Sequence, residues 1–119
     1  MTSRLIAIAV DCRNAEALAE FWREALDYPK THRWTDAHGV TYVELTAPDG
    51  PSLLFQPVPE DKTVKNRLHL DLAPRTLDQR DEVERLVTLG AKVLADPDDD
   101  PWIVLADPQG NEFCVLPRR

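Results

Sequence analysis

The sequence predicts an α+β fold in which two βαβββ modules form a cupped, partly open mixed-sheet barrel with the helices outside. The order strand, helix, strand, strand, strand occurs twice along the 119 residues. When the later strands of the two halves are aligned at one constant offset, Leu45 falls on Leu105 and Gly50 on Gly110. At a slightly larger offset, alternating apolar residues of the first strands also match: Ile6, Ile8 and Val10 fall on Leu68, Leu70 and Leu72. A register kept over two separate stretches indicates an internal repeat.

The first module spans about residues 1–58. An apolar run over residues 5–10 has the length of a strand, and Asn14 follows at a helix N-cap position. Apolar residues at helical spacing then predict an amphipathic helix over residues 15–26, with Trp22 in its buried stripe. Residues 28–39 are rich in turn formers but leave room for a short strand. Two further strands are expected over residues 40–46 and 52–58, joined by a turn at 47–50.

The second module spans about residues 67–119 and follows a polar linker, residues 59–66. Apolar and polar residues alternate strictly over residues 67–72, which predicts a strand with one polar face. Thr76 and Gln79 fit a capping box, and Gly90 fits a helix stop. Strands are expected over residues 91–94, 102–106 and 111–116, with an acidic, solvated loop over residues 96–101. We expect both modules to form one domain.

The composition excludes several classes of partner. The formal net charge of −7 argues against binding to nucleic acid or to anionic lipid. No apolar stretch reaches the roughly 20 residues that span a bilayer, and the first strand lacks the features of a signal peptide. Cys12 and Cys114 are far apart and form no CxxC pair, so we expect reduced thiols in a cytoplasmic protein.

The first strand of each module has one face that cannot form a dense core. Leu68, Leu70 and Leu72 are expected to pack on a helix. The opposite face then carries Arg67, His69 and Asp71, where the first module carries Leu5, Ala7 and Ala9. If the sheets curve together, this face lines a concavity in which a small molecule can bind.

Three motifs carry a resemblance to a known family. They are Glu20-Phe21-Trp22 with Leu26, the helix end Leu89-Gly90-Ala91, and the turn Asp107-Pro108-Gln109-Gly110-Asn111. Together they resemble the vicinal oxygen chelate superfamily, which includes glyoxalase I, extradiol dioxygenases, fosfomycin-resistance enzymes and bleomycin-binding proteins. The match covers nearly the whole chain, which looks most like the small glyoxalase-like branch. The resemblance also implies a homodimer.

The resemblance implies four metal ligands, from the first and last strands of each module. His69 stands at the expected place in module two, whereas Ala7 of module one cannot bind a metal. In register, the last strands supply Leu54 and Cys114, neither of which is the expected carboxylate. Gln56 and Glu112 lie two residues away on the same strand faces. If a metal is bound, its expected ligands are His69 and Glu112, with Gln56 as a further possible ligand and Cys114 as an unusual thiolate option.

Each candidate also has an ordinary structural interpretation. His69 is a ligand, a general base oriented by Asp71, or a hydrogen-bonded strand histidine. Glu112 is a carboxylate of the site or the partner of Arg67, and we favour the pairing. Arg67 itself can hold an anionic ligand.

Besides Arg67, the candidates for ligand binding are Gln56, Trp34, Trp102 and Cys114. The two tryptophans flank loops and can line a pocket. His32 and His38 lie in a polar loop and are expected to be exposed.

Three functions stay open, and we favour the first. The first is a protein that binds a small molecule and whose metal site is degenerate. The second is a metal-dependent lyase, isomerase or dioxygenase using Zn, Ni, Mn or Fe as a Lewis acid. The third is a metal-free acid–base enzyme that uses His69 with Asp71 or Glu112. Glyoxalase I activity is the least favoured, because it needs four ligands and a glutathione site.

Overall fold

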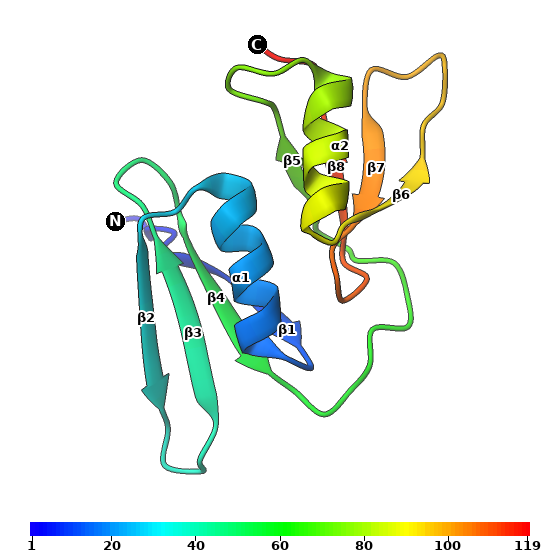
Figure 1. The fold of residues 1–119 in the computed structure, drawn as a ribbon. Helices are drawn as coiled ribbons and strands as arrows, with labels where there is room; N and C mark the ends of the chain where they lie inside the picture. Colours follow the sequence, from blue (N-terminus) through cyan, green and yellow to red (C-terminus); the bar gives the residue numbers. More distant parts are fainter. The chain divides into compact units, whose positions relative to one another are not determined.

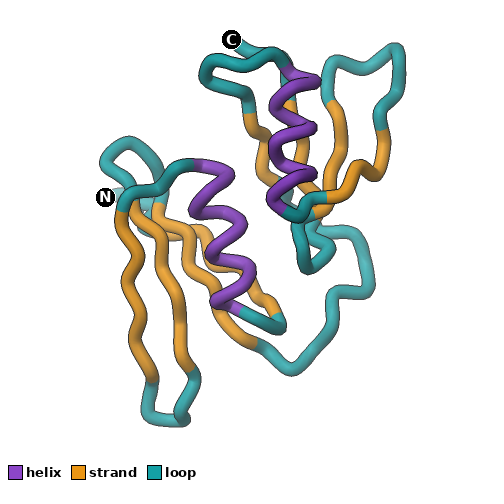
Figure 2. The backbone as a smooth tube through the Cα atoms, viewed as in Figure 1, coloured by secondary structure: helices purple, strands orange, loops and turns teal.

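The computed structural model describes residues 1–119 and shows two compact units, Met1–Asp61 and Lys62–Arg119. Each unit has one helix and four strands in the order βαβββ (Figures 1 and 2). The predicted α+β class and the two βαβββ modules are therefore confirmed. The closure of the two sheets into a cup, and the division into one domain, stay predictions.

The first unit is a four-stranded sheet with a helix on one face (Figure 1). The sheet order is β1-β4-β3-β2, with β1 parallel to β4 and the other pairs antiparallel. Its elements are β1 Ala7–Cys12, α1 Ala15–Leu26, β2 Lys30–Thr35, β3 Thr41–Thr46 and β4 Ser52–Pro57. The short strand for which the turn-rich region left room is β2.

Helix α1 has the predicted bounds. Asn14 caps it in extended conformation, and its side-chain oxygen accepts from the N–H of Ala17 at 3.0 Å. The helix ends at Asp27, which adopts the left-handed conformation with φ of 56°. The apolar stripe packs on β3 and β4, and Trp22 is buried as predicted.

The second unit repeats this plan with the sheet order β5-β8-β7-β6, in which β5 is parallel to β8. Its elements are β5 Leu70–Leu72, α2 Gln79–Leu89, β6 Lys92–Ala95, β7 Ile103–Ala106 and β8 Glu112–Val115. Strand β6 is an edge strand and is irregular between Val93 and Ala95. None of the helices is both long and apolar enough to cross a membrane.

The capping box predicted at Thr76 is wrong. Helix α2 is capped by Asp78, whose carboxylate accepts from the N–H of Asp81 at 2.8 Å. Gln79 does not take part in the cap. Its side-chain amide donates to the carbonyl oxygens of Pro101 and Val115. The helix stops at Gly90 as predicted, with φ of 127°, a conformation that favours glycine.

Strand pairing shows that the sequence repeat is a structural repeat. Val43 pairs with Phe55 in the first unit, and their sequence equivalents Ile103 and Val115 pair in the second. The parallel pairs follow the repeat too, because Ala9 pairs with Leu54 where Asp71 pairs with Cys114. The same alternation of buried residues therefore builds both sheets. The buried row contains Val43, Leu45, Leu53 and Phe55 in the first unit and Ile103, Leu105, Phe113 and Val115 in the second.

The first strand of each unit begins later than predicted, and the apolar residues before it are exposed: β1 is shifted to Ala7–Cys12 at the same length, and β5 is shortened to Leu70–Leu72. Leu68 is 87% exposed, and Ile6 is 69% exposed, so neither packs on a helix as expected. The β5 ladder begins at Leu70, opposite Phe113; in the same register Leu68 would lie opposite Asn111, whose carbonyl instead accepts from the N–H of Asp107 in a turn. The β1 ladder begins opposite Ser52 because Pro51, before it, has no N–H to donate.

Candidate functional site

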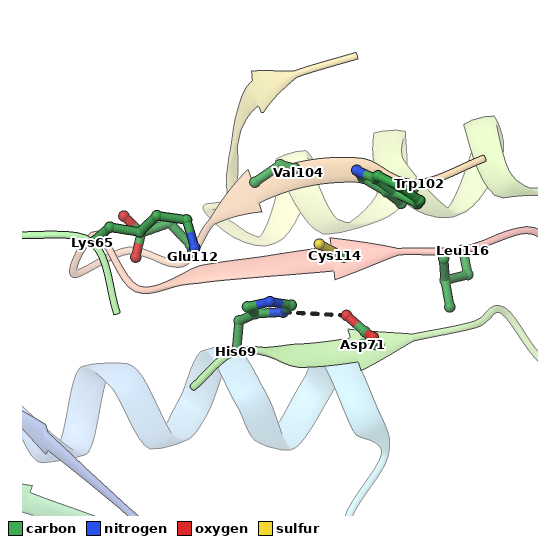
Figure 3. Close-up of a pocket in the computed structure, with 8 residues that line it drawn as sticks. All are labelled: Lys65, His69, Asp71, Trp102, Val104, Glu112, Cys114 and Leu116. Atoms are coloured by element: carbon green, nitrogen blue, oxygen red, sulfur yellow. Dashed lines mark ion pairs between the residues drawn. The ribbon is translucent and has the colours of Figure 1, made fainter. Parts of the chain in front are cut away.

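A pocket of about 390 Å³ opens on one face of the second unit's sheet (Figure 3). This volume lies within the range typical of small-molecule sites. The pocket is lined by Lys65, His69, Asp71, Trp102, Val104, Glu112, Cys114 and Leu116. The helix α2 packs on β6 and β8, and the lining residues of β8 are the ones that alternate with its buried residues Phe113 and Val115.

The parallel pairing of β5 with β8 brings three reactive side chains together. Asp71 pairs with Cys114, so their side chains lie next to each other on one face of the sheet. His69 stands two residues before Asp71 and shares that face. Its Nδ1 atom is 3.3 Å from Oδ1 of Asp71 (Figure 3). Because each of these side chains is only partly covered, all three are accessible from the pocket.

The environment of Cys114 keeps its thiol protonated. Burial raises the pKa of Cys114, and the charge of Asp71 and a hydrogen bond to that carboxylate raise it further. Lys65 acts in the opposite direction. A thiol of this kind is a poor nucleophile on its own, so its expected roles are contact with a ligand or binding of a metal.

Glu112 lies at one end of the pocket and is held by the chain segment that precedes β5. Its Oε1 accepts from the N–H of Asn66 at 2.9 Å, and its Oε2 accepts from Nζ of Lys62 at 3.0 Å. The Asn66 N–H and Lys62 lower the pKa of the Glu112 carboxyl. The expected pairing with Arg67 is wrong, because Lys62 and the backbone of Asn66 occupy both oxygens and Arg67 lies exposed.

The predicted turn before β8 fixes the position of Glu112 and Cys114. Asp107 is buried, and its Oδ1 accepts from the backbone N–H of Gln109 and of Asn111. Gly110 has φ of 90°, which a residue with a Cβ rarely adopts. Asn66 also donates to the side chain of Asn111 at 3.0 Å. The turn is therefore tied both to β8 and to the segment that carries Lys65.

The apolar wall of the pocket comes from Trp102, Val104 and Leu116. Trp102 is among the residues predicted for the site, whereas Val104, Leu116 and Lys65 are not. Val104 alternates with the buried Ile103 and Leu105, and this alternation is the signal that could have placed it on the open face. Lys65 lies in the polar linker, where no periodicity reports its direction.

The other predicted site residues lie outside this pocket. Gln56 belongs to β4 of the first unit, where it pairs with Asp11. Trp34 belongs to β2 and stacks on Tyr42 with ring centroids 5.5 Å apart. His32 and His38 are exposed, as expected. The roles assigned to Arg67, Gln56 and Trp34 stay predictions.

The metal set implied by the family resemblance fits this chain only in part. Ala7 and Leu54 have no donor atom. Glu112 has its carboxylate bound by Lys62 and Asn66. His69, Asp71 and Cys114, in contrast, have ligand atoms that all lie within 4.8 Å of one another. An imidazole, a carboxylate and a thiolate are a suitable donor set for zinc.

These features define a protein of duplicated βαβββ architecture with a pocket on one sheet. A family model described as a glyoxalase-like domain matches residues 7–116. The chain belongs to this family, which places it in the vicinal oxygen chelate superfamily. No curated protein matches it significantly in sequence.

Solved structures share the fold at low sequence identity. A variant of the fosfomycin resistance protein FosX from Listeria monocytogenes, in complex with Mn(II) and dihydroxypropylphosphonic acid, is 13% identical with a TM-score of 0.75. The similarity covers 100% of this chain and 95% of that one. The trypanothione-dependent glyoxalase I of Leishmania major is 14% identical over 97% of this chain and 86% of its own, with a TM-score of 0.68. A glyoxalase-related enzyme from Fulvimarina pelagi is 19% identical over 97% and 88%, also with a TM-score of 0.68.

Proposed function

We propose that this protein binds a small organic molecule in the pocket of its second unit. The pocket itself carries the proposal, because it joins an apolar wall to a row of polar side chains within about 390 Å³. Sites for small molecules combine these features, the apolar wall supplying binding energy and the polar groups fixing orientation. The natural ligand is expected to be small.

The lining residues indicate the form of such a ligand. Trp102 offers an aromatic surface, so a planar or aromatic part is expected to contact it. His69 and Asp71 lie on the other side of Cys114 from Trp102 and Val104 and can bind a hydroxyl, carbonyl or amine group (Figure 3). Lys65 favours an anionic group near its end of the pocket. The Asp71–His69 pair can also move a proton, since the carboxylate orients the imidazole.

The experiment is a screen of planar, oxygen-bearing compounds followed by tryptophan fluorescence titration. A ligand of the pocket is expected to change the emission of Trp102. Trp102→Phe should remove that change, and Trp34→Phe should keep it, because Trp34 lies on β2 of the first unit. Binding that is insensitive to Trp102→Phe and to His69→Ala would place the ligand elsewhere and contradict the proposal.

A second candidate function is a metal-dependent reaction of the vicinal oxygen chelate type: a lyase, isomerase or dioxygenase. The cluster of His69, Asp71 and Cys114 favours it, and the FosX structure from Listeria monocytogenes holds Mn(II). A bound divalent ion acts as a Lewis acid toward substrate oxygens. In that case His69 serves as a ligand, and Trp102 and Leu116 keep water from the substrate's apolar part.

Elemental analysis and calorimetric titration with Zn²⁺, Ni²⁺, Mn²⁺ and Fe²⁺ test this candidate. Stoichiometric binding in the wild type and its loss in His69→Ala are expected. His32→Ala is the control, because His32 is an exposed histidine of the first unit. If no ion binds, the metal-dependent candidate is excluded and the organic ligand site stands on its own test.

We also propose that the protein acts in the cytoplasm as a homodimer. Each sheet has two edge strands, β1 and β2 in the first unit and β5 and β6 in the second, and an edge strand can pair with a second copy of the chain. Light scattering coupled to size-exclusion chromatography measures the mass directly. A mass of 13.5 kDa per particle would match one chain and contradict the dimer.

A further inference from the structure

We propose that His69, Asp71 and Cys114 form a thiolate-containing site selective for zinc-like divalent cations, built from β5, the residue directly before it, and β8 of the second unit alone. The proposal rests on the second candidate function and deepens it, because it names the ligand set and the class of metal. It departs from the expected pair His69 and Glu112, since the Glu112 carboxylate is already held by Lys62 and Asn66.

The geometry needs only small side-chain rotations to close around an ion. Bond lengths of about 2.0–2.3 Å in tetrahedral zinc sites place neighbouring ligand atoms roughly 3.3–3.7 Å apart. Nδ1 of His69 and Oδ1 of Asp71 are already 3.3 Å apart. The widest spacing in the cluster is within 4.8 Å, and the half-exposed side chains of His69 and Asp71 have room to turn.

The backbone under the cluster is fixed, so the site is preorganised. Asp71 and Cys114 are direct partners in the parallel ladder. That ladder continues to Leu72 opposite Val115 and ends with the N–H of Leu116 donating to the carbonyl of Leu72 at 2.7 Å. The turn at Asp107 holds the other end of β8. Three protein ligands would leave one coordination position of a tetrahedral ion for water or a substrate, as in catalytic zinc sites.

The donor set decides which ions bind. Cys114 binds as a thiolate and releases its proton to the solvent when the ion enters. A thiolate favours zinc-like ions, whereas Mn²⁺ and Mg²⁺ prefer oxygen donors. The chain is therefore expected to differ in metal preference from the FosX structure, which contains Mn(II).

The equivalent positions of the first unit support this assignment as a feature of the second unit alone. Ala7, Ala9 and Leu54 stand where the second unit has His69, Asp71 and Cys114, by the same equivalence that the strand pairing follows. None of the three has a donor atom. The first unit therefore serves as an internal reference for the effect of ligand substitutions in the second unit.

The experiment titrates Co²⁺ into the tag-free, chelator-treated full-length protein and records its absorption spectrum. A cobalt–thiolate ligand is expected to give a strong near-ultraviolet charge-transfer band at one equivalent, together with the intense visible bands of tetrahedral coordination. Zn²⁺ should displace the cobalt, and a large excess of Mn²⁺ should not. Cys114→Ser should abolish the charge-transfer band, and Cys12→Ser should retain it.

Further variants keep the test decisive if Cys114→Ser folds poorly. His69→Ala and Asp71→Asn alter partly exposed side chains and should each weaken Zn²⁺ binding by more than about 100-fold. Loss of a residue that only hydrogen-bonds to a metal ligand already weakens metal binding by about 10–100-fold. Asp11→Asn and His32→Ala are the matched controls in the first unit.

Three results would overturn the proposal: cobalt bound without a thiolate band, a band that persists in Cys114→Ser, or Mn²⁺ binding as tight as that of Zn²⁺. These would leave the metal-dependent candidate standing with another ligand set. Absence of any metal binding would overturn both the proposal and that candidate. Binding of an organic ligand is tested independently by Trp102 fluorescence, so none of these metal results decides it.

Discussion

The two units share one backbone plan and differ in the chemistry that the plan carries. In the first unit, Ala9 pairs with Leu54 at the position where Asp71 pairs with Cys114 in the second. The buried residues that alternate with these pairs are apolar in both units. The comparison teaches that the buried row sets strand pairing, whereas the opposite row is free to carry either a featureless surface or a reactive site.

The two helices also differ in how apolar their buried residues are. Six residues of α1 are buried and all are apolar. Only three residues of α2 are buried, and one of them is Glu82, whose carboxylate binds Arg85 through two hydrogen bonds of 2.7 and 2.9 Å. The core of the first unit is thus the more apolar of the two, and the second unit combines a leaner core with the candidate site.

The sharpest test of this comparison removes equivalent buried leucines. Leu45→Ala and Leu105→Ala each delete a fully buried side chain of the central rows. Each is expected to lower the free energy of unfolding by about 2–5 kcal/mol, the range typical of such cavities. Urea denaturation measures both losses. A loss below about 1 kcal/mol at one of the two positions only would show that the two leucines are not packed equivalently.

A smaller effect is expected at the contact that only the second unit has. Glu112→Gln removes the charge that Lys62 binds, which should cost about 1–2 kcal/mol because the partners are largely covered. The cost should be smaller in acid. The pKa of Glu112 is lowered in the folded protein, so its stabilising effect exists above the unfolded-state pKa and is lost as pH falls through the folded-state pKa.

Denaturation of wild type and Glu112→Gln across the acid range measures whether the difference between their free energies of unfolding becomes smaller as the pH falls. Arg67→Gln is the control, since Arg67 is exposed and both oxygens of Glu112 are held by other groups. If Arg67→Gln has the larger effect, the assignment of Lys62 as the partner of Glu112 is incorrect.

The helix caps provide a matched pair of still smaller effects. Asn14→Ala and Asp78→Ala each remove a side chain that accepts from a first-turn N–H, at 3.0 and 2.8 Å. Each is expected to cost about 1 kcal/mol of unfolding free energy. Thr76→Ala should cost less, because Asp78 and not Thr76 caps α2. A larger loss at Thr76 than at Asp78 would restore the capping box.

The smallest expected effect concerns the hairpin between β2 and β3 of the first unit. A hydrogen bond from the Tyr42 hydroxyl lowers the pKa of Asp36, and backbone N–H groups lower it further. Tyr42→Phe should raise that pKa while leaving the fold intact. Carboxyl titration by NMR measures the change. Tyr28→Phe, whose hydroxyl donates to Pro51 instead, should leave it unaltered.

Much of the fold was predictable because it rests on local signals. Helix α1 has the predicted bounds, since its apolar spacing and the Asn14 cap act within a few residues of each other. The turn at Asp107 and the stop at Gly90 are also local. The repeat was visible because each unit needs the same alternating buried row.

The capping error at Thr76 was local, because Asp78 two residues later caps α2, whereas two other errors arose where a partner distant in sequence decided the outcome. Leu68 is exposed because Asn111, far along the chain, is committed to a turn and not to the ladder. Glu112 binds Lys62 and Asn66, because the segment before β5 runs beside the start of β8. The alternation of apolar and polar residues within a strand cannot predict either contact, since it indicates the face on which a residue lies but not its neighbour on another segment.

The sequence by itself determined the α+β class, the duplicated βαβββ order and the polar face that carries His69 and Asp71. These follow from periodicity and turn chemistry, which act over short distances along the chain. Only the tertiary structure decided that Cys114 lies beside Asp71 and that Glu112 is already paired. The physical reason is that strand register joins segments far apart in the sequence, and side-chain chemistry depends on which atoms that register brings together.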